Sequence, residues 1–464
     1  MNEARLPLSR ALAYAAPGFA LAIPLVPVFT FLPTLYARDV GLGLAGTGTV
    51  LFVARAVDFL LDPLIGLGSD RIETRFGRRK PWIVVGAIIA GAALFALFAP
   101  PAGAGAAYLF LWLALLYLGF TAVQIPYTAW GAELVPDYHE RTRITGLREG
   151  LTLAGIVTTG ALPVAATLMG LSERRGMVAI ALLAILCGGP AIALLAWRVP
   201  EGRVRENERV GRVDLRAMLA NRPFLRLFCA WFVNGLATGV PAVLFPFYLQ
   251  YGLIAGQMAR GVMIFTYFAA GACAIPAWLV ASRRFGKHRV WCCAMLMAMA
   301  AFVWVPLLQP GADAAFFVVC LVTGAALGAD LALPPAMQAD VVDLDNLRTG
   351  AARAGFYFAI WGMGTKLALG AAAGGAFYAL DLVGFDPNGG NGPRALFALA
   401  ATYALAPVAL KSVAVALVWN FPVTPRRHAI IRRRLAEREA LSARSRAVPA
   451  GNRARMAGDG RASA

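Results

Sequence analysis

Long apolar segments alternate with short polar ones along almost the whole chain. Segments of about 17–25 residues, long enough to cross the hydrocarbon core of a bilayer as a helix, recur twelve times. They cover residues 10–36, 43–68, 82–99, 106–130, 146–170 and 177–197 in the first half, and 225–250, 259–281, 289–307, 313–338, 353–380 and 395–420 in the second. The first segment ends without a small-residue cleavage site, so we expect a retained span. The pattern predicts an all-α membrane protein of twelve transmembrane helices.

A basic loop motif occurs twice, once in each half of the chain. Residues 69–80 follow the second apolar segment, and their Phe-Gly followed by basic residues is repeated at 282–289 after the eighth. This internal repeat predicts a six-helix half at 1–200, a linker at 201–224, a second half at 225–424 and a partly disordered basic tail at 425–464. We expect the first loop to serve conformational change through a tight turn and salt bridges, with Asp70, Arg71, Gly77, Arg78 and Arg79 as its members.

Composition and charge agree with a membrane protein. Hydrophobic residues make up 59% of the 464 positions and charged residues 15%, whereas soluble domains are about 45–50% apolar and 25% charged. The net charge is +18, and the basic residues concentrate in alternate loops and in the tail. The positive-inside rule therefore predicts cytoplasmic termini in a bacterial-type inner membrane. We interpret the basic tail as a cytoplasmic topology anchor and expect no nucleic-acid partner. We also expect the protein to function as a monomer.

Charged side chains inside the apolar segments are the candidate functional residues. Asp58 and Asp62 lie one helical turn apart in the second segment, where Arg55 is another charged residue. An ionised group at the bilayer centre costs at least about 2.5 kcal/mol, and like charges at i, i+4 repel each other. A cation, a proton or Arg55 must therefore lie close to them. Lys366, alone among apolar and small residues, needs a carboxylate or a ligand for the same reason.

Other chemistries lack support in the sequence. The six cysteines show no metal-ligand spacing, and the three histidines fall outside the predicted spans. Residues 41–46 satisfy G-x-G-x-x-G but follow no strand, and no P-loop of the G-x-x-x-x-G-K-[ST] kind is present. The sequence therefore predicts a protein that is not an enzyme and has no cofactor.

Four motifs occur in the order found in one family of transporters. They are DFLLDPLIG at 58–66, GRRKPW at 77–82, AELVPDYHERTR at 132–143 and ADVVD at 339–343. With these motifs the chain resembles the glycoside-pentoside-hexuronide:cation symporters of the major facilitator superfamily. The resemblance implies two six-helix halves that transport a small-molecule substrate by alternating access, coupled to Na⁺ or H⁺.

The resemblance also implies roles for individual residues. Asp58, Asp62 and Thr121 match the coupling-cation site, a possible Na⁺ site, and Arg55 and Lys366 match its charge network. We expect the substrate cavity to contain the polar and aromatic residues Gln124, Tyr127, Arg148, Trp231, Asn234, Asp330, Trp361 and Lys366. Asp330 has no counterpart in the family pattern. It is either a cavity residue, a partner of Lys366 or a residue at the cytoplasmic end of its helix.

Departures from the family pattern leave the substrate and the ion open. The sugar-binding aspartate of the first helix falls at 17–19, where this chain has Pro-Gly-Phe, and that of the fourth is Gln124. The aromatic residue that stacks on the sugar is Thr128 here. In the family a polar residue precedes the second cation-binding aspartate, and this chain has Leu61 in its place. This loss shifts the expectation towards H⁺.

Several substrates and modes of action fit this pattern. The solute could be a sugar or glycoside, an anionic sugar held by Arg148 and Lys366, or an amphipathic molecule such as a lysophospholipid. An efflux antiporter of the same superfamily and a membrane scaffold that transports nothing are the other readings.

Overall fold

The computed structural model describes residues 6–72, 74–134, 138–201, 218, 220–349, 354–424, 426–431, 433–435 and 437–438, and these are almost wholly helical. The first span combines α1 (Leu8–Ala22), η1 (Pro27–Phe31), α2 (Leu32–Thr34) and η2 (Leu35–Asp39). Its two π-helical stretches η1 and η2 lie in a region that contains several prolines. Because proline lacks a backbone N–H, it interrupts the regular α-helical hydrogen bonds, and a wider turn accommodates the break.

The other helices follow the predicted spans closely. The first half continues with α3 (Gly43–Arg71), α4 (Lys80–Phe98), α5 (Ala106–Leu134), α6 (Tyr138–Leu168) and α7 (Glu173–Arg198). The second half contains α9 (Arg222–Phe247), η3 (Tyr248–Gly252), α10 (Gln257–Phe285), α11 (Lys287–Phe302), η4 (Val305–Leu307), α12 (Asp313–Thr349), α13 (Ala354–Leu382) and α14 (Pro393–Val418).

Eleven spans of the described part are long and apolar enough to cross a membrane. Helix α13 has 29 residues and is also long enough, but Lys366 and several glycines make it less apolar. The prediction of an all-helical membrane protein is confirmed.

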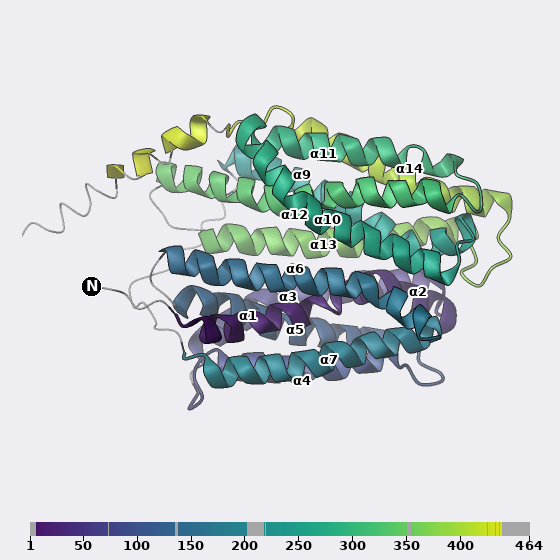
Figure 1. The fold of residues 1–464 in the computed structure, drawn as a ribbon, viewed down its shortest axis with the longest axis horizontal. Coiled ribbons are helices and arrows are strands. Elements are labelled where there is room, and N and C mark those ends of the chain that lie inside the picture. The colour runs from purple at the N-terminus through teal and green to yellow at the C-terminus, as the bar shows by residue number, and fades with distance from the viewer. Residues whose placement is uncertain are drawn as a thin grey trace, which may run out of the picture.

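The helices form two bundles that lie side by side, α1 to α7 in one and α9 to α14 in the other (Figure 1). Helix α3 packs against α13, and α6 packs against α10, so two helix pairs join the halves. Glycines allow this close approach: a Cβ on Gly48 of α3 would lie 3.1 Å from the Cβ of Phe377 on α13. The interface between the halves is therefore built on small residues, as is usual for helices in membranes.

The two ends of the bundle differ. The basic end, defined here as the end with loops 72–79 and 283–287 and the described tail residues, lies to the left in Figure 1. At the opposite end the halves are linked by polar contacts. The Nη1 of Arg38 donates to Gln250 Oε1 at 2.5 Å, and the Nε2 of Gln257 donates to the carbonyl oxygen of Leu171 at 3.3 Å. The structure is thus closed at the end away from the basic loops.

The first basic loop has the tight turn that the sequence predicts. Gly77 has φ +102°, in the left-handed region that favours glycine, and a Cβ there would overlap the carboxylate of Glu201. Arg79 is buried and its Nη1 donates to Ser69 Oγ at 2.9 Å, while Arg78 is half-buried in the same loop. The side chains of Asp70 and Arg71 lie outside the described residues.

The described part of the tail contacts the basic end of α12. The Nε2 of His428 lies 3.0 Å from Asp343 Oδ2 and 3.4 Å from Asp340 Oδ1. Farther along, Arg438 Nη1 donates to the carbonyl oxygen of Leu347 at 3.2 Å. These contacts attach the start of the tail to the second half.

Close packing of α10 and α12 gives a stability prediction. A Cβ on Gly328 would overlap the carbonyl oxygen of Gly271, so Gly328→Ala forces two helix backbones apart. Overpacking of this kind costs about 1–3 kcal/mol, and we expect a lower melting temperature for the purified protein. Gly375→Ala is the matched control, since nothing lies within 4 Å of the added carbon. Equal melting temperatures for the two variants would contradict this packing.

Candidate functional site

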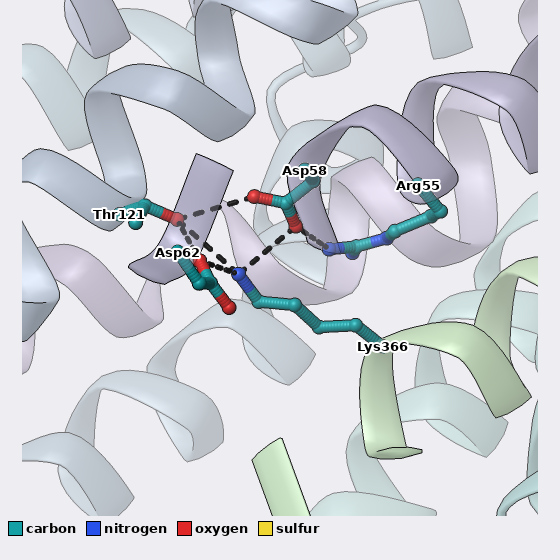
Figure 2. A network of polar contacts seen from close by, with 5 residues as sticks. All are labelled: Arg55, Asp58, Asp62, Thr121 and Lys366. Atoms are coloured by element: carbon teal, nitrogen blue, oxygen red, sulfur yellow. Dashed lines mark hydrogen bonds and ion pairs between the residues drawn. The ribbon is translucent and has the colours of Figure 1, made fainter. Parts of the chain in front are cut away.

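Three helices bring five polar side chains together between the halves (Figure 2). Helix α3 supplies Arg55, Asp58 and Asp62, α5 supplies Thr121, and α13 supplies Lys366. Residues three or four positions apart share one face of a helix, which is why the three side chains of α3 point the same way. The lysine comes from the second half and the other four residues from the first. The cluster therefore spans the interface between the two halves.

The ammonium group of Lys366 is held by three oxygens. Its Nζ lies 2.7 Å from Asp62 Oδ1, 3.0 Å from Asp58 Oδ2 and 3.2 Å from Thr121 Oγ1. The Thr121 hydroxyl oxygen is also 3.1 Å from Asp58 Oδ1 and 3.0 Å from Asp62 Oδ1, so it can donate its proton to either carboxylate. These short contacts supply the positive charge that two neighbouring carboxylates in an apolar segment require.

Arg55 is the second cation of the cluster. Its Nη1 lies 3.1 Å from Asp58 Oδ2. The guanidinium carbon lies 3.9 Å from the ring centroid of Tyr117 and 4.7 Å from that of Phe29. These distances allow cation–π interactions that fix the arginine in place. Two positive side chains thus balance two carboxylates.

Asp58 is the most buried of the charged side chains in the cluster, and Asp62, one turn nearer the basic end, is more exposed. The side chain of Asp58 is 1% exposed, that of Asp62 17% and that of Lys366 26%. Helix α3 runs from the closed end to the basic end, so Asp62 lies one turn nearer the basic end than Asp58. Gln124, three residues after Thr121 on α5, is exposed. The site is therefore more accessible from the basic end.

A cavity of about 350 Å³ lies next to the cluster, between the halves. Most of its lining is apolar and comes from both bundles. Arg55 and Tyr117 contribute polar groups on the first half, and Asp330 and Lys411 do so on the second. This volume falls within the range of about 300–1,000 Å³ typical of sites for small molecules.

Of the eight predicted cavity residues, Asp330 lines this cavity and the other seven do not. Tyr127 and Arg148 are two of these seven, and both have other contacts. Tyr127 is buried against Tyr14: its hydroxyl donates to the carbonyl oxygen of Tyr14 at 2.6 Å, and the Tyr14 hydroxyl donates back to the carbonyl of Tyr127 at 3.1 Å. It joins α1 to α5 and is absent from the cavity lining. Arg148 pairs with Glu149 at 2.6 Å, and its guanidinium carbon is 5.9 Å from the Tyr127 ring centroid.

Trp231 and Trp361 form a pair beside the lysine of the cluster. Their rings stack with centroids 5.0 Å apart and planes inclined by 15°. The Nε1 of Trp231 donates to Thr365 Oγ1 at 2.8 Å, and Thr365 directly precedes Lys366. The pair thereby joins α9 to α13 near the lysine.

Of the three alternatives for Asp330, pairing with Lys366 is wrong, and Asp330 is among the residues that line the cavity. Asp330 Oδ2 lies 3.4 Å from the Nζ of Lys411, and that Nζ donates to Asn234 Oδ1 at 2.7 Å. Sequence reasoning overlooked Lys411, although it lies in the apolar segment 395–420 and could have been found by the argument used for Lys366.

Two structural details concern the ligands that the protein could bind. Within the described ranges, no group of three or more His, Cys, Asp or Glu residues could hold a metal ion. Two carboxylates and a hydroxyl are instead hard oxygen ligands suited to Na⁺ or a proton.

At Gly18, the region of the expected sugar-binding aspartate, a Cβ would lie 2.8 Å from Thr152 Oγ1 and 3.0 Å from the carbonyl oxygen of Arg148. A larger side chain there would require Thr152 and the neighbouring backbone to shift.

Comparisons with known proteins agree with the fold. A sequence model of the family described as "MFS/sugar transport protein" matches residues 13–425. The chain is 23% identical to an isoprimeverose transporter of Lactiplantibacillus pentosus over 95% of each chain. It is 24% identical to the sodium-dependent lysophosphatidylcholine symporter 1 of Mus musculus, over 81% of this chain and 78% of the relative.

A solved structure has a similar fold. It is a bacterial homologue of the human lysosomal transporter Spinster in an inward-facing, unoccupied conformation. The TM-score is 0.64 at 15% identity, over 90% of this chain and 98% of the other.

Removing the lysine of the cluster gives a stability prediction. Lys366→Met leaves two carboxylates with one arginine, and breaking a buried ion pair costs about 3–5 kcal/mol, less where water reaches the partners. We therefore expect a lower melting temperature and partial recovery when Asp62→Asn is added, because the surplus charge is removed. Arg433→Met is the control, since Arg433 and Glu437 form an exposed pair. If Asp62→Asn gave no recovery, the assigned charge balance would be wrong.

Proposed function

Because the chain belongs to the MFS/sugar transport protein family, we propose that it is a cation-coupled symporter that carries a sugar or glycoside-type solute by alternating access. Family and fold make it a multi-pass membrane protein and a secondary transporter of the major facilitator superfamily. The observation that supports coupling is the ion pair between Lys366 of one half and Asp58 and Asp62 of the other.

The coupling ion and Lys366 compete for the same oxygens in this proposal. Na⁺ or H⁺ that binds Asp58 or Asp62 weakens the attraction of these carboxylates for the ammonium group. Lys366 can then separate from α3, and the two halves lose a contact at the centre of the membrane. Cation binding therefore favours the rocking movement, and solute binding between the halves completes it. By linkage, if the cation tightens solute binding, the solute tightens cation binding by the same factor.

The choice of ion follows from the number of ligands. Na⁺ needs several oxygens, and Asp58, Asp62 and Thr121 provide a start. A proton needs one carboxylate, and Leu61 adds no oxygen to the site, which favours H⁺.

We place the basic end in the cytoplasm of a bacterial-type inner membrane by the positive-inside rule. We also propose that the protein transports its solute as a monomer.

The apolar cavity favours a second candidate substrate. Most of the residues that line the 350 Å³ space are apolar, which suits a molecule with an apolar portion better than a free sugar. An amphipathic solute such as a lysophospholipid is therefore the alternative within the same transport mechanism. The similarity to a lysophosphatidylcholine symporter adds support.

A thermal-shift screen identifies the solute class and the ion together. Purified protein is heated with sugars, uronates and lysolipids, each with and without Na⁺ and at two pH values. A ligand that binds the folded state at about 100 times its Kd stabilises it by about 2.7 kcal/mol. We expect a rise in melting temperature with one solute class that is larger when the coupling ion is present. A solute shift that is independent of both Na⁺ and pH would contradict coupling.

Neutralising either aspartate gives a transport prediction. In proteoliposomes with an inward ion gradient, Asp58→Asn and Asp62→Asn should abolish accumulation of the solute found in the screen, because the charge that binds the cation is lost. Exchange of labelled solute across the membrane can persist. Asp313→Asn, at the start of α12 and away from the cluster, is the control. Undiminished gradient-driven accumulation in both aspartate variants would refute the proposal, and accumulation driven only by an outward gradient would indicate an antiporter.

A further inference from the structure

A second charged cluster lies wholly within the second half. Lys411 of α14 lies 3.4 Å from Asp330 of α12 and donates to Asn234 of α9 at 2.7 Å. The Nε1 of Trp291 on α11 donates to Asp330 Oδ1 at 2.6 Å. Four helices thus meet at one buried ion pair.

This cluster cannot work as a latch between the halves. Its four residues belong to one bundle, so a rocking movement of that bundle carries them together and breaks none of their contacts. The side chains of Lys411 and Asp330 are only 5% and 9% exposed, and burying such a pair in a membrane is costly. Ionisable residues in this setting usually serve a ligand or an ion pathway.

The pair is also part of the cavity wall. Both Lys411 and Asp330 line the 350 Å³ cavity, across from Arg55 and Tyr117 of the first half. The Lys411 ammonium has three N–H groups and donates to two acceptors in the described part of the chain. Each carboxylate oxygen of Asp330 accepts one hydrogen bond and retains a second lone pair. A donor and an acceptor are therefore available side by side.

The balance of charge indicates which ligand fits. An anion would be attracted by Lys411 but repelled by Asp330 close beside it. A hydroxyl group, in contrast, can accept a hydrogen bond from Lys411 and donate its own proton to Asp330. The rest of the cavity lining is mostly apolar and suits an apolar group on the same molecule.

We propose that Lys411, Asp330 and Asn234 form a hydroxyl-binding subsite for a neutral solute that carries both hydroxyl groups and an apolar portion, such as an aryl or alkyl glycoside. The proposal rests on the transport function proposed above and specifies the solute within it. Lys411 and Asp330 bind the hydroxyl directly. Asn234 is a positioning residue that holds the ammonium group.

Binding measurements with matched probes test this subsite. The wild-type protein is placed in lipid nanodiscs, which avoids glycoside detergents. Kd values are measured by calorimetry for p-nitrophenyl glucoside, galactoside and xyloside and for the anionic p-nitrophenyl glucuronide. We expect at least one neutral glycoside to bind more tightly than the glucuronide. A preference of tenfold or more for the glucuronide would overturn the proposal.

The main variant removes both charges at nearly constant volume. Asp330→Asn combined with Lys411→Gln should raise the Kd of the neutral glycoside about tenfold or more, because two charge-assisted hydrogen bonds are lost. The change in melting temperature caused by the coupling ion alone should stay as in the wild type. Lys287→Gln with Asp340→Asn is the matched control: it neutralises another Lys–Asp pair of the second half, which is absent from the cavity lining. An unchanged Kd in the cavity variant would overturn the subsite.

A single variant keeps the test decisive if the double variant fails to fold. Asp330→Asn removes the acid but leaves the lysine charge, so it should improve binding of the glucuronide relative to the neutral glycoside by about tenfold. A purely structural role would leave this ratio unchanged, and an unchanged ratio would overturn the proposal.

Failure of the subsite and failure of coupling give different results. If lysophosphatidylcholine raises the melting temperature and no glycoside binds, the hydroxyl subsite is wrong and ion coupling is untouched. If glycosides bind as expected but Asp58→Asn and Asp62→Asn accumulate solute normally, the subsite stands and coupling through the aspartates fails.

Discussion

The structure depends on the attraction between Lys366 of the second half and the carboxylates of Asp58 and Asp62 in the first. In a medium of low dielectric constant, a charged side chain without a partner of opposite charge is costly. In this cluster each half therefore carries a charge imbalance inside an apolar span that the other half corrects. In the proposed mechanism, the contact that stabilises one arrangement of the halves is also the contact that a small cation replaces.

The two buried ion pairs differ in what movement does to them. The pair of Lys366 with the aspartates joins the halves, so its energy changes when they rock. The pair of Lys411 with Asp330 stays within one half and keeps its energy through the same movement. The first pair is suited to control conformation, and the second is suited to bind a ligand in every conformation. In the proposed mechanism, similar chemistry serves two purposes because one pair joins helices of different halves and the other joins helices of the same half.

Much of the fold could be predicted from the sequence, and the site only in part. Apolar segments of bilayer length fixed the helices, and the family resemblance, now confirmed, gave their arrangement in two halves. The same resemblance brought Thr121 and Lys366 to the aspartates. Tyr127 could not be placed, because its contact with Tyr14 depends on how two helices are rotated about their axes. For the same reason the sequence left three alternatives open for Asp330 and named Lys366, not Lys411, as the lysine with which it could pair.

The packing of the first helix explains why a solute would need groups from the second half. Gly18 lies against the backbone and Thr152 of α6, so an acidic side chain at this position of α1 would require these neighbours to shift. On α5, Gln124 replaces a charged acceptor by a neutral amide. The first half therefore presents its carboxylates at Asp58 and Asp62, where they are already engaged with Lys366 and Arg55. Among the described residues that line the cavity, Asp330 is the one with an acidic side chain. A hydroxylated solute that needs a charged acceptor must then reach across to Asp330, and such a solute would contact both halves at once, as alternating access requires.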